Sequence, residues 1–276
     1  MSINRFSWFN ATAITFGFAF LYLPILLLII YSFNASKLVT VWGGFSTRWY
    51  GSLLQNQMFI DAAWVTLEVG LLSATLAAIL GTMAALVLNK AGRFPGRMLF
   101  SGMIYSPMVM PEVITGLSLL LLFVAISMDR GYWTIVIAHT TFATCYVTVV
   151  VSSRLVSFDH SLEEAALDLG CTPFSAFWQV TLPIILPAIV AGWLLAFTLS
   201  MDDLVIASFT SGPASTTLPM KIYSQVRLGL NPEINALSTI LILVVATGVV
   251  LTSLITKQAE TRRQREERAA LAQADG

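Results

Sequence analysis

Four carboxylates stand inside long apolar runs of the sequence, where an ionisable side chain is costly to place. They are Glu68, Glu112 and the adjacent pair Asp202 and Asp203. A carboxylate among apolar side chains replaces part of the water around a passing cation, and a nearby aromatic face adds cation–π attraction. We therefore expect this acidic group to mark a path for a cationic solute.

The same carboxylates also fit structural roles, which differ from residue to residue. Adjacent residues on a helix point about 100° apart, so Asp202 and Asp203 are not expected to face the same pore. One of them is expected on the path, and the other caps a helix break or pairs with a basic residue of a neighbouring subunit. Glu112 either lines the path or caps a helix that starts after Pro111. Glu68 either lines the path or bonds a neighbouring helix.

Aromatic side chains near these runs supply candidate faces for the cation. We assign Tyr31, Trp42 and Trp193 to the path together with the acidic residues. His139 also lies in an apolar run. We expect it to be packed and hydrogen-bonded rather than to act as a proton relay.

The elements that must position these residues are long and apolar. Of the 276 residues, 57% are hydrophobic and 11% are charged, whereas a soluble domain carries about 25% charged residues. Continuous apolar windows of roughly 20 residues, enough to cross a bilayer, recur along the chain. They predict an all-α polytopic membrane protein that forms a single domain, with the third span broken near Pro107 and Pro111. We place six spans at about 11–33, 62–88, 99–127, 132–152, 182–209 and 235–256.

The distribution of Lys and Arg predicts how the spans are oriented. With the N-terminus in the cytoplasm, ten of the 15 Lys and Arg residues fall on the inner side. Positive residues concentrate in cytoplasmic connections, so both termini are expected there. The polar insert at 153–181 and the charged tail at 257–276 then lie inside as well.

The polar insert is predicted to form two short helices. Ser161 and Glu164 fit a capping box, in which Ser is the N-cap and Glu the third helical residue. Gly170 can end this helix with a positive φ. Thr172 and Pro173 then start the next helix, since Pro is favoured at the first helical position.

A motif of acidic and small residues runs through the insert to the start of the fifth span. It consists of Glu164, Ala165, Ala166, Gly170, Leu182 and Pro183. With Val180 where Ile is usual, it resembles the EAA loop of the inner-membrane permeases of ABC importers. The resemblance implies the MetI-like, type I importer fold. It also implies that the insert is the coupling helix, which docks in a groove on a cytoplasmic ATPase.

Four other stretches extend this similarity over nearly the whole chain. They are YSFN (31–34), SPMVMPEVITGLSLLLLF (106–123), LSMDDLVIASFTSGP (199–213) and TTLPMKIYSQVRLGLNPEINA (216–236). They resemble the polyamine branch of the family. The resemblance implies import by alternating access of putrescine, or alternatively of spermidine or another cationic amine. For a diamine, two separated carboxylate sites would select both length and charge.

The resemblance further implies a set of partners in the bacterial inner membrane. A dimer of cytoplasmic ATP-binding subunits would hydrolyse ATP, and a second, related permease would supply the other half of the pathway. A periplasmic binding protein would deliver the substrate to the outer loops, including 210–234. ATP and Mg would belong to the ATPase, so this chain is expected to bind no cofactor and not to be an enzyme.

The sequence lacks the motifs of several competing classes. It has no GxxxxGK[ST] phosphate loop for ATP, no HExxH motif and no cluster of His and Cys that would hold a metal. The short, mixed-charge tail does not favour nucleic-acid binding. Cys145 and Cys171 are expected to be free thiols. An autonomous secondary transporter, with a cation or proton relay through the acidic residues, is the alternative; no inverted repeat supports it, and it would leave the insert unexplained.

Overall fold

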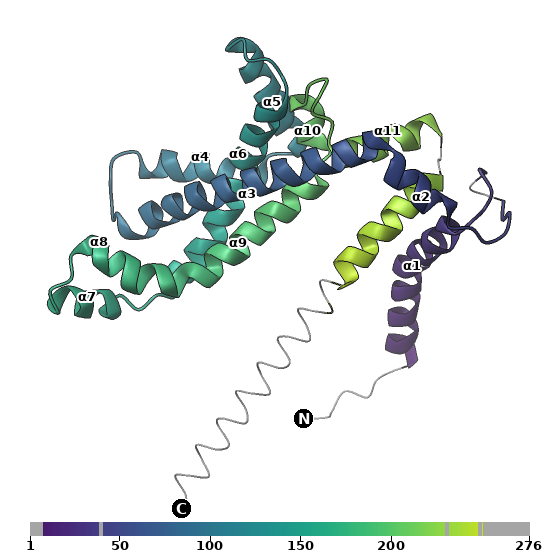
Figure 1. The fold of residues 1–276 in the computed structure, drawn as a ribbon. Coiled ribbons are helices and arrows are strands. Elements are labelled where there is room, and N and C mark those ends of the chain that lie inside the picture. The colour runs from purple at the N-terminus through teal and green to yellow at the C-terminus, as the bar shows by residue number, and fades with distance from the viewer. Residues whose placement is uncertain (1–7, 39–40, 230–231, 248–249, 251–276) are drawn as a thin grey trace, which may run out of the picture. The chain divides into compact units, whose positions relative to one another are not determined.

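Helices account for nearly all the regular structure in the part of the chain that the computed structural model describes, which is residues 8–38, 41–229, 232–247 and 250. An isolated antiparallel bridge joins Asn34 and Phe45. The helices in Figure 1 are α1 (Trp8–Ser32), α2 (Arg48–Gln55), α3 (Gln57–Lys90), α4 (Arg97–Val109), α5 (Glu112–Ala125), α6 (Tyr132–Val156), α7 (Ser161–Asp168), α8 (Pro173–Ala176), the π-helical segment η1 (Phe177–Thr181), α9 (Leu182–Asp202), α10 (Val205–Thr210) and α11 (Leu218–Leu228), and a further helix covers Pro232–Thr247.

The chain divides into two compact units. Unit 1 comprises Met1–Asn56 with Gln225–Gly276, and unit 2 comprises Gln57–Ser224. Within unit 1, α2 is tied to the start of the Pro232–Thr247 helix by Glu233, whose carboxylate accepts hydrogen bonds from the Ser52 hydroxyl and the Asn56 amide. Unit 2 holds the four candidate carboxylates and the whole polar insert, so it contains most of the candidate functional residues.

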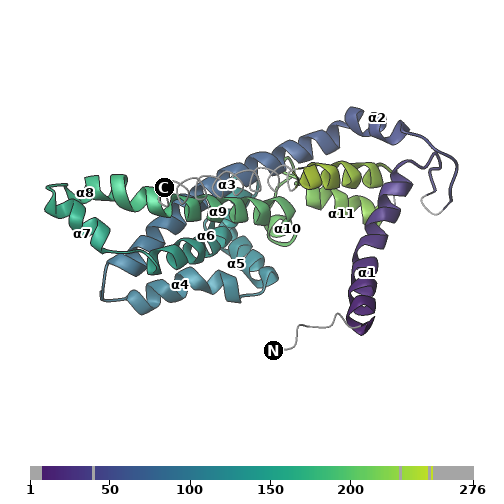
Figure 2. The same ribbon diagram turned by 90° about the horizontal axis from the view of Figure 1, so that it is seen from below.

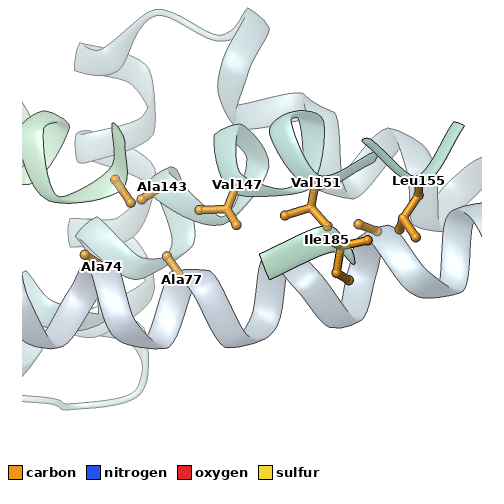
Figure 3. Packing of buried hydrophobic residues seen from close by; sticks show 9 residues of the cluster. Ala74, Ala77, Ala143, Val147, Val151, Leu155 and Ile185 are labelled. Atoms are coloured by element: carbon orange, nitrogen blue, oxygen red, sulfur yellow. The ribbon is translucent and has the colours of Figure 1, made fainter. Parts of the chain in front are cut away.

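Small residues let three helices of unit 2 pack closely. Helices α3, α6 and α9 run alongside one another in both views of the ribbon (Figures 1 and 2). Alanines of α3 meet branched side chains of α6 and α9 in a buried cluster (Figure 3). The cluster consists of Ala74, Ala77, Ala85, Ala143, Val147, Val151, Leu155, Ile185 and Ala196. The two helices α3 and α6 approach closely beside Gly81, where an added Cβ would lie 2.7 Å from the Cβ of Val147.

Replacing Gly81 by Leu is expected to separate α3 from α6 and to lower the melting temperature of the purified protein in detergent. Overpacking a core costs about 1–3 kcal/mol. Gly102 is the matched control, because it is also a helical glycine but has no atom within 4 Å of an added Cβ. Equal melting temperatures for Gly81→Leu and Gly102→Leu would contradict the close approach.

The structure confirms an all-helical protein with several membrane spans. Four helical stretches are long and apolar enough to cross a bilayer: Trp8–Ser32, Gln57–Lys90, Tyr132–Val156 and Pro173–Asp202. Helices α4 and α5 pass the same test as a pair, bent by 118° at Met110 and Pro111. The expected break in the third span is therefore confirmed, although Pro107 stays inside α4.

Two element boundaries in the structure differ from those predicted. In place of one helix over the fifth expected span, at about 182–209, the structure has α9, which ends at Asp202, and α10, which begins at Val205 after the extended residue Asp203. At its other end this helix runs back without interruption to Pro173, so the insert is shorter than predicted. The sixth expected span, 235–256, lies partly outside the described residues, and the tail at 257–276 lies wholly outside them.

Candidate functional site

The insert between α6 and α9 contains one short helix, α7, and a turn that leads into α8, the first segment of the long helix Pro173–Asp202. We call α7, α8 and the residues joining them the coupling hairpin. The predicted capping box at Ser161 and Glu164 is wrong, because α7 begins at Ser161 and its N-cap is His160. The carboxylate of Asp159 accepts a hydrogen bond from the Ser161 N–H at 3.0 Å and so satisfies one of the free donors at the helix start. The hydroxyl and N–H of Ser161 also hold the pKa of Asp159 below its usual range.

The turn between the two helices forms as predicted. Gly170 has a φ of +90°, and the N–H groups of Gly170 and Cys171 bond the carbonyls of Leu167 and Ala166. These paired bonds form a Schellman motif, in which glycine supplies the left-handed residue. The hydroxyl of Thr172 then accepts a hydrogen bond from a backbone N–H in the first turn of α8, and the helix begins at Pro173.

The coupling hairpin exposes large apolar side chains around its acidic motif. Leu169 is 87% exposed and Phe174 73%, and Trp178, in the adjoining segment η1, lies edge-on to Phe174 at 6.1 Å between ring centroids. Glu164 and Ala165 are exposed beside them. Exposed apolar side chains gathered around charged ones are typical of a protein interaction surface. The sequence reasoning missed Trp178, although its i,i+4 spacing from Phe174 is a signal for a contact.

The motif residues are divided between the hairpin and the helix that follows it. Glu164, Ala165, Ala166 and Gly170 lie together on or directly after α7. Leu182 and Pro183 lie instead in the first turn of α9, where Leu182 packs against the core cluster. The motif thus joins an exposed surface to the first turn of a helix that packs against the core cluster.

At the opposite end of α9, the break at Asp203 is held by a buried polar network. The Asp203 carboxylate accepts hydrogen bonds from the N–H groups of Ala207, at 2.7 Å, and Ile206, at 3.3 Å. It also bonds Nε2 of His139 at 3.1 Å, and Nδ1 of His139 bonds the Ser200 hydroxyl at 2.6 Å. His139 is therefore packed and hydrogen-bonded, as expected, and Asp203 caps a helix break.

The neighbouring carboxylate, Asp202, is the last residue of α9 and is exposed. The structure thus separates the two acidic residues, since Asp203 is committed to its network. Glu112 is the first residue of α5, where its exposed charge lies at the positive end of the helix. Glu68 is exposed on α3. The sequence reasoning missed Ser200, because no pattern reveals a hydrogen-bond partner on another helix.

The three aromatic candidates lie in different places. Tyr31 and Trp42 belong to unit 1, where their rings meet edge-on at 6.2 Å. Trp193 lies on α9, stacked on Phe197 at 5.4 Å, and its Nε1 donates a hydrogen bond to the Thr75 hydroxyl. About 14 Å of helix separates Trp193 from Asp202, so the structure does not bring these two residues together.

Neither a metal site nor a disulfide is found in the described part of the chain. No group of three or more His, Cys, Asp or Glu side chains there is arranged to hold a metal ion. Cys145 and Cys171 are free thiols, and Cys145 is buried.

Known proteins with similar sequences indicate the family to which the chain belongs. Residues 77–265 match the family described as "Binding-protein-dependent transport system inner membrane component". The chain is 56% identical over 272 residues to the putrescine transport system permease protein PotI of Escherichia coli K12, covering 96% of each chain. It is 42% identical over 240 residues to the spermidine/putrescine transport system permease protein PotC of the same strain, covering 87% of this chain and 90% of the relative.

Solved structures share the fold at low sequence identity. A chain of a bacterial ABC transporter involved in the import of the acidic polysaccharide alginate has a TM-score of 0.73 and 17% identity, covering 91% of this chain and 99% of that one. A chain of the MetNI methionine ABC transporter, in an inward-facing conformation, has a TM-score of 0.60 and 16% identity, covering 72% and 94%. At these identities the likeness concerns the fold alone.

Proposed function

Because the chain belongs to the family of inner-membrane components of binding-protein-dependent transport systems, we propose that it forms half of the pathway through which an ABC importer carries a polyamine. Putrescine is the first candidate substrate. The observation that carries the choice of substrate is the 56% identity, over 96% of each chain, to a putrescine transport permease. Spermidine is the second candidate, supported by the 42% identity to a spermidine/putrescine permease.

Membership of this family establishes the general role of the chain. It is a multi-pass protein of the inner membrane and a permease subunit rather than an enzyme. ATP is hydrolysed by a separate subunit, and the permease itself binds no cofactor. The chain therefore works only as a component of a transport complex.

Six spans with both ends in the cytoplasm are proposed for its topology. The spans are α1, α3, the bent pair α4 and α5, α6, the helix at Pro173–Asp202, and the segment that begins at residue 232. Two contacts support the sidedness. Lys90 at the end of α3 bonds Glu163 of α7, so the basic connection at 89–98 lies with the coupling hairpin. The Thr134 hydroxyl bonds the Thr210 carbonyl at 2.7 Å, which joins the start of α6 to the end of α10.

The coupling hairpin is proposed to dock on one subunit of a cytoplasmic ATPase dimer. Its exposed apolar side chains and Glu164 support this role. Without a docked partner, these apolar side chains would remain exposed to water. Closure of the ATPase dimer would displace the hairpin and, through the helix that begins at Pro173, shift the spans between inward- and outward-facing states. Nucleotide and a loaded periplasmic binding protein would bias these two states.

Asp202 is proposed as the carboxylate that faces the substrate, with Glu112 as a second acidic position. Asp202 is exposed at the end of a span, whereas Asp203 is engaged with His139 and the start of α10. An ammonium group entering from the periplasmic side would meet Asp202 near the break. A second, related permease would supply the facing half of the pathway.

The whole transport complex, reconstituted into proteoliposomes, tests this function. The chain is purified from its native membrane in mild detergent, and its partners are identified by mass spectrometry before reconstitution. We expect a P-loop ATPase and a second EAA-bearing permease to co-purify, and ATP-dependent uptake of labelled putrescine to require the binding protein. Uptake by this chain alone, without any ATPase, would overturn the proposal in favour of a secondary transporter.

A further inference from the structure

Lys90, the last residue of α3, gathers three other segments of unit 2 around its ammonium group. Its Nζ donates a hydrogen bond to the Glu163 carboxylate on α7 at 2.5 Å and to the Thr181 hydroxyl at 3.2 Å. It also lies 5.5 Å from the ring centroid of Phe158, which stands between α6 and α7. One cation thus joins the coupling hairpin to the ends of two core helices.

Helix α7 packs against α8 and η1, but it forms few polar contacts with the other helices. None of its residues is buried. Among the residues that the structure describes, Glu163 is the one side chain of α7 that forms a hydrogen bond or ion pair with another helix. The pair is also shielded from water, since its side chains are 24% and 23% exposed, and shielding reduces the screening that weakens surface ion pairs.

The third partner, Thr181, lies where the helix geometry changes. Residues Phe177–Thr181 form a π-helical turn between α8 and α9, and Thr181 at its end is fully buried. Such turns are frequent at functional sites, because the extra residue per turn can be lost or gained locally. A displacement of Thr181 would therefore act at the π-helical turn of the helix that continues to Asp202.

We propose that Lys90 is a positioning residue that passes the movement of α7 to α3 and, through Thr181, to α9. This inference rests on the proposed docking of the coupling hairpin on an ATPase. Glu164 would face the ATPase, and Glu163, one residue earlier, would bind the permease's own Lys90. Adjacent glutamates would then have different partners, one between subunits and one within this chain.

The test compares transport with ATP hydrolysis in the reconstituted complex. Lys90→Met and Glu163→Gln are expected to lower putrescine uptake about tenfold while binding-protein-stimulated ATPase activity stays near that of the unmodified complex. The number of ATP molecules hydrolysed per molecule imported therefore rises. A merely structural role would reduce both activities together through loss of assembled complex.

Further variants control for charge and for folding. Arg93→Met removes a nearby exposed cation and should leave the ATP-to-substrate ratio unchanged. Lys90→Arg should retain most coupling, and Lys90→Glu combined with Glu163→Lys should recover more uptake than either single change. If Lys90→Met does not assemble, Glu163→Gln measures the same contact.

The outcomes separate this inference from the proposed function. Normal ATP-to-substrate ratios in both Lys90→Met and Glu163→Gln, alongside an inactive Glu164→Lys complex, would overturn the role of Lys90 and leave the docking surface intact. Normal uptake in Glu164→Lys would instead overturn the docking on which the inference rests.

Discussion

Changing Glu164 to Lys is expected to abolish putrescine uptake while the chain stays folded in the membrane. Glu164 is exposed on α7, within the apolar and acidic surface of the coupling hairpin. Reversing its charge places a cation where an acidic residue is proposed to meet the ATPase, and like charges opposed across an interface are strongly unfavourable. Uptake of labelled putrescine into proteoliposomes should fall by about a hundredfold.

The control for Glu164→Lys is the same charge change at Asp129, an exposed residue of the turn between α5 and α6. Asp129→Lys should assemble and transport normally. Co-purification of the ATPase gives a second readout, since Glu164→Lys should lose this subunit and Asp129→Lys should keep it. A Glu164→Lys complex that retains its ATPase and imports at the normal rate would show that α7 does not couple the two subunits.

The two aspartates at the end of α9 are expected to respond differently to replacement by Asn. Asp202→Asn should keep the melting temperature of the complex and lower uptake about tenfold, because a hydrogen bond to a charged group contributes about 1.5–3 kcal/mol. Asp203→Asn should instead lower the melting temperature, because a neutral amide replaces the carboxylate that bonds His139 and two backbone N–H groups, and a hydrogen bond to a charged group contributes about 1.5–3 kcal/mol.

Uptake assays over a range of putrescine and spermidine concentrations, paired with thermal unfolding in detergent, distinguish these effects. Asp202→Asn should alter the selectivity between the two polyamines, whereas Asp203→Asn should reduce the yield of folded complex without altering selectivity. If both variants transport with unchanged rate and selectivity, Asp202 is not on the pathway.

Much of the fold could be predicted from the sequence because its strongest signals are local. Long apolar runs predict spanning helices, and proline at positions 107 and 111 predicts a break, which the structure places at Met110 and Pro111. Gly170, Thr172 and Pro173 predict the hairpin turn, since their backbone preferences act within a few residues. The EAA motif likewise lies within a short stretch.

The misplaced features depend on contacts that local patterns do not reveal. Ser161 fits the N-cap pattern, but Asp159 bonds the helix start and His160 becomes the N-cap. The apolar run after Asp203 suggests a longer fifth span, but Asp203 is held by His139, which is 64 residues away in the sequence. In the sequence, Lys90 is an ordinary basic residue at the end of a helix. Its partners, Glu163 and Thr181, are distant in the sequence and become evident only in the structure.

The close approach of α3 and α6 has a consequence for where the permease can bend. The Val147 side chain packs directly over Gly81, so sliding one helix along the other would press it against neighbouring residues that carry a Cβ. We therefore expect α3 and α6 to move together as one rigid body, without sliding along each other. Within unit 2, joints that remain available to a transport cycle include the kink at Met110 and Pro111, the π-helical turn at Phe177–Thr181 and the break at Asp203.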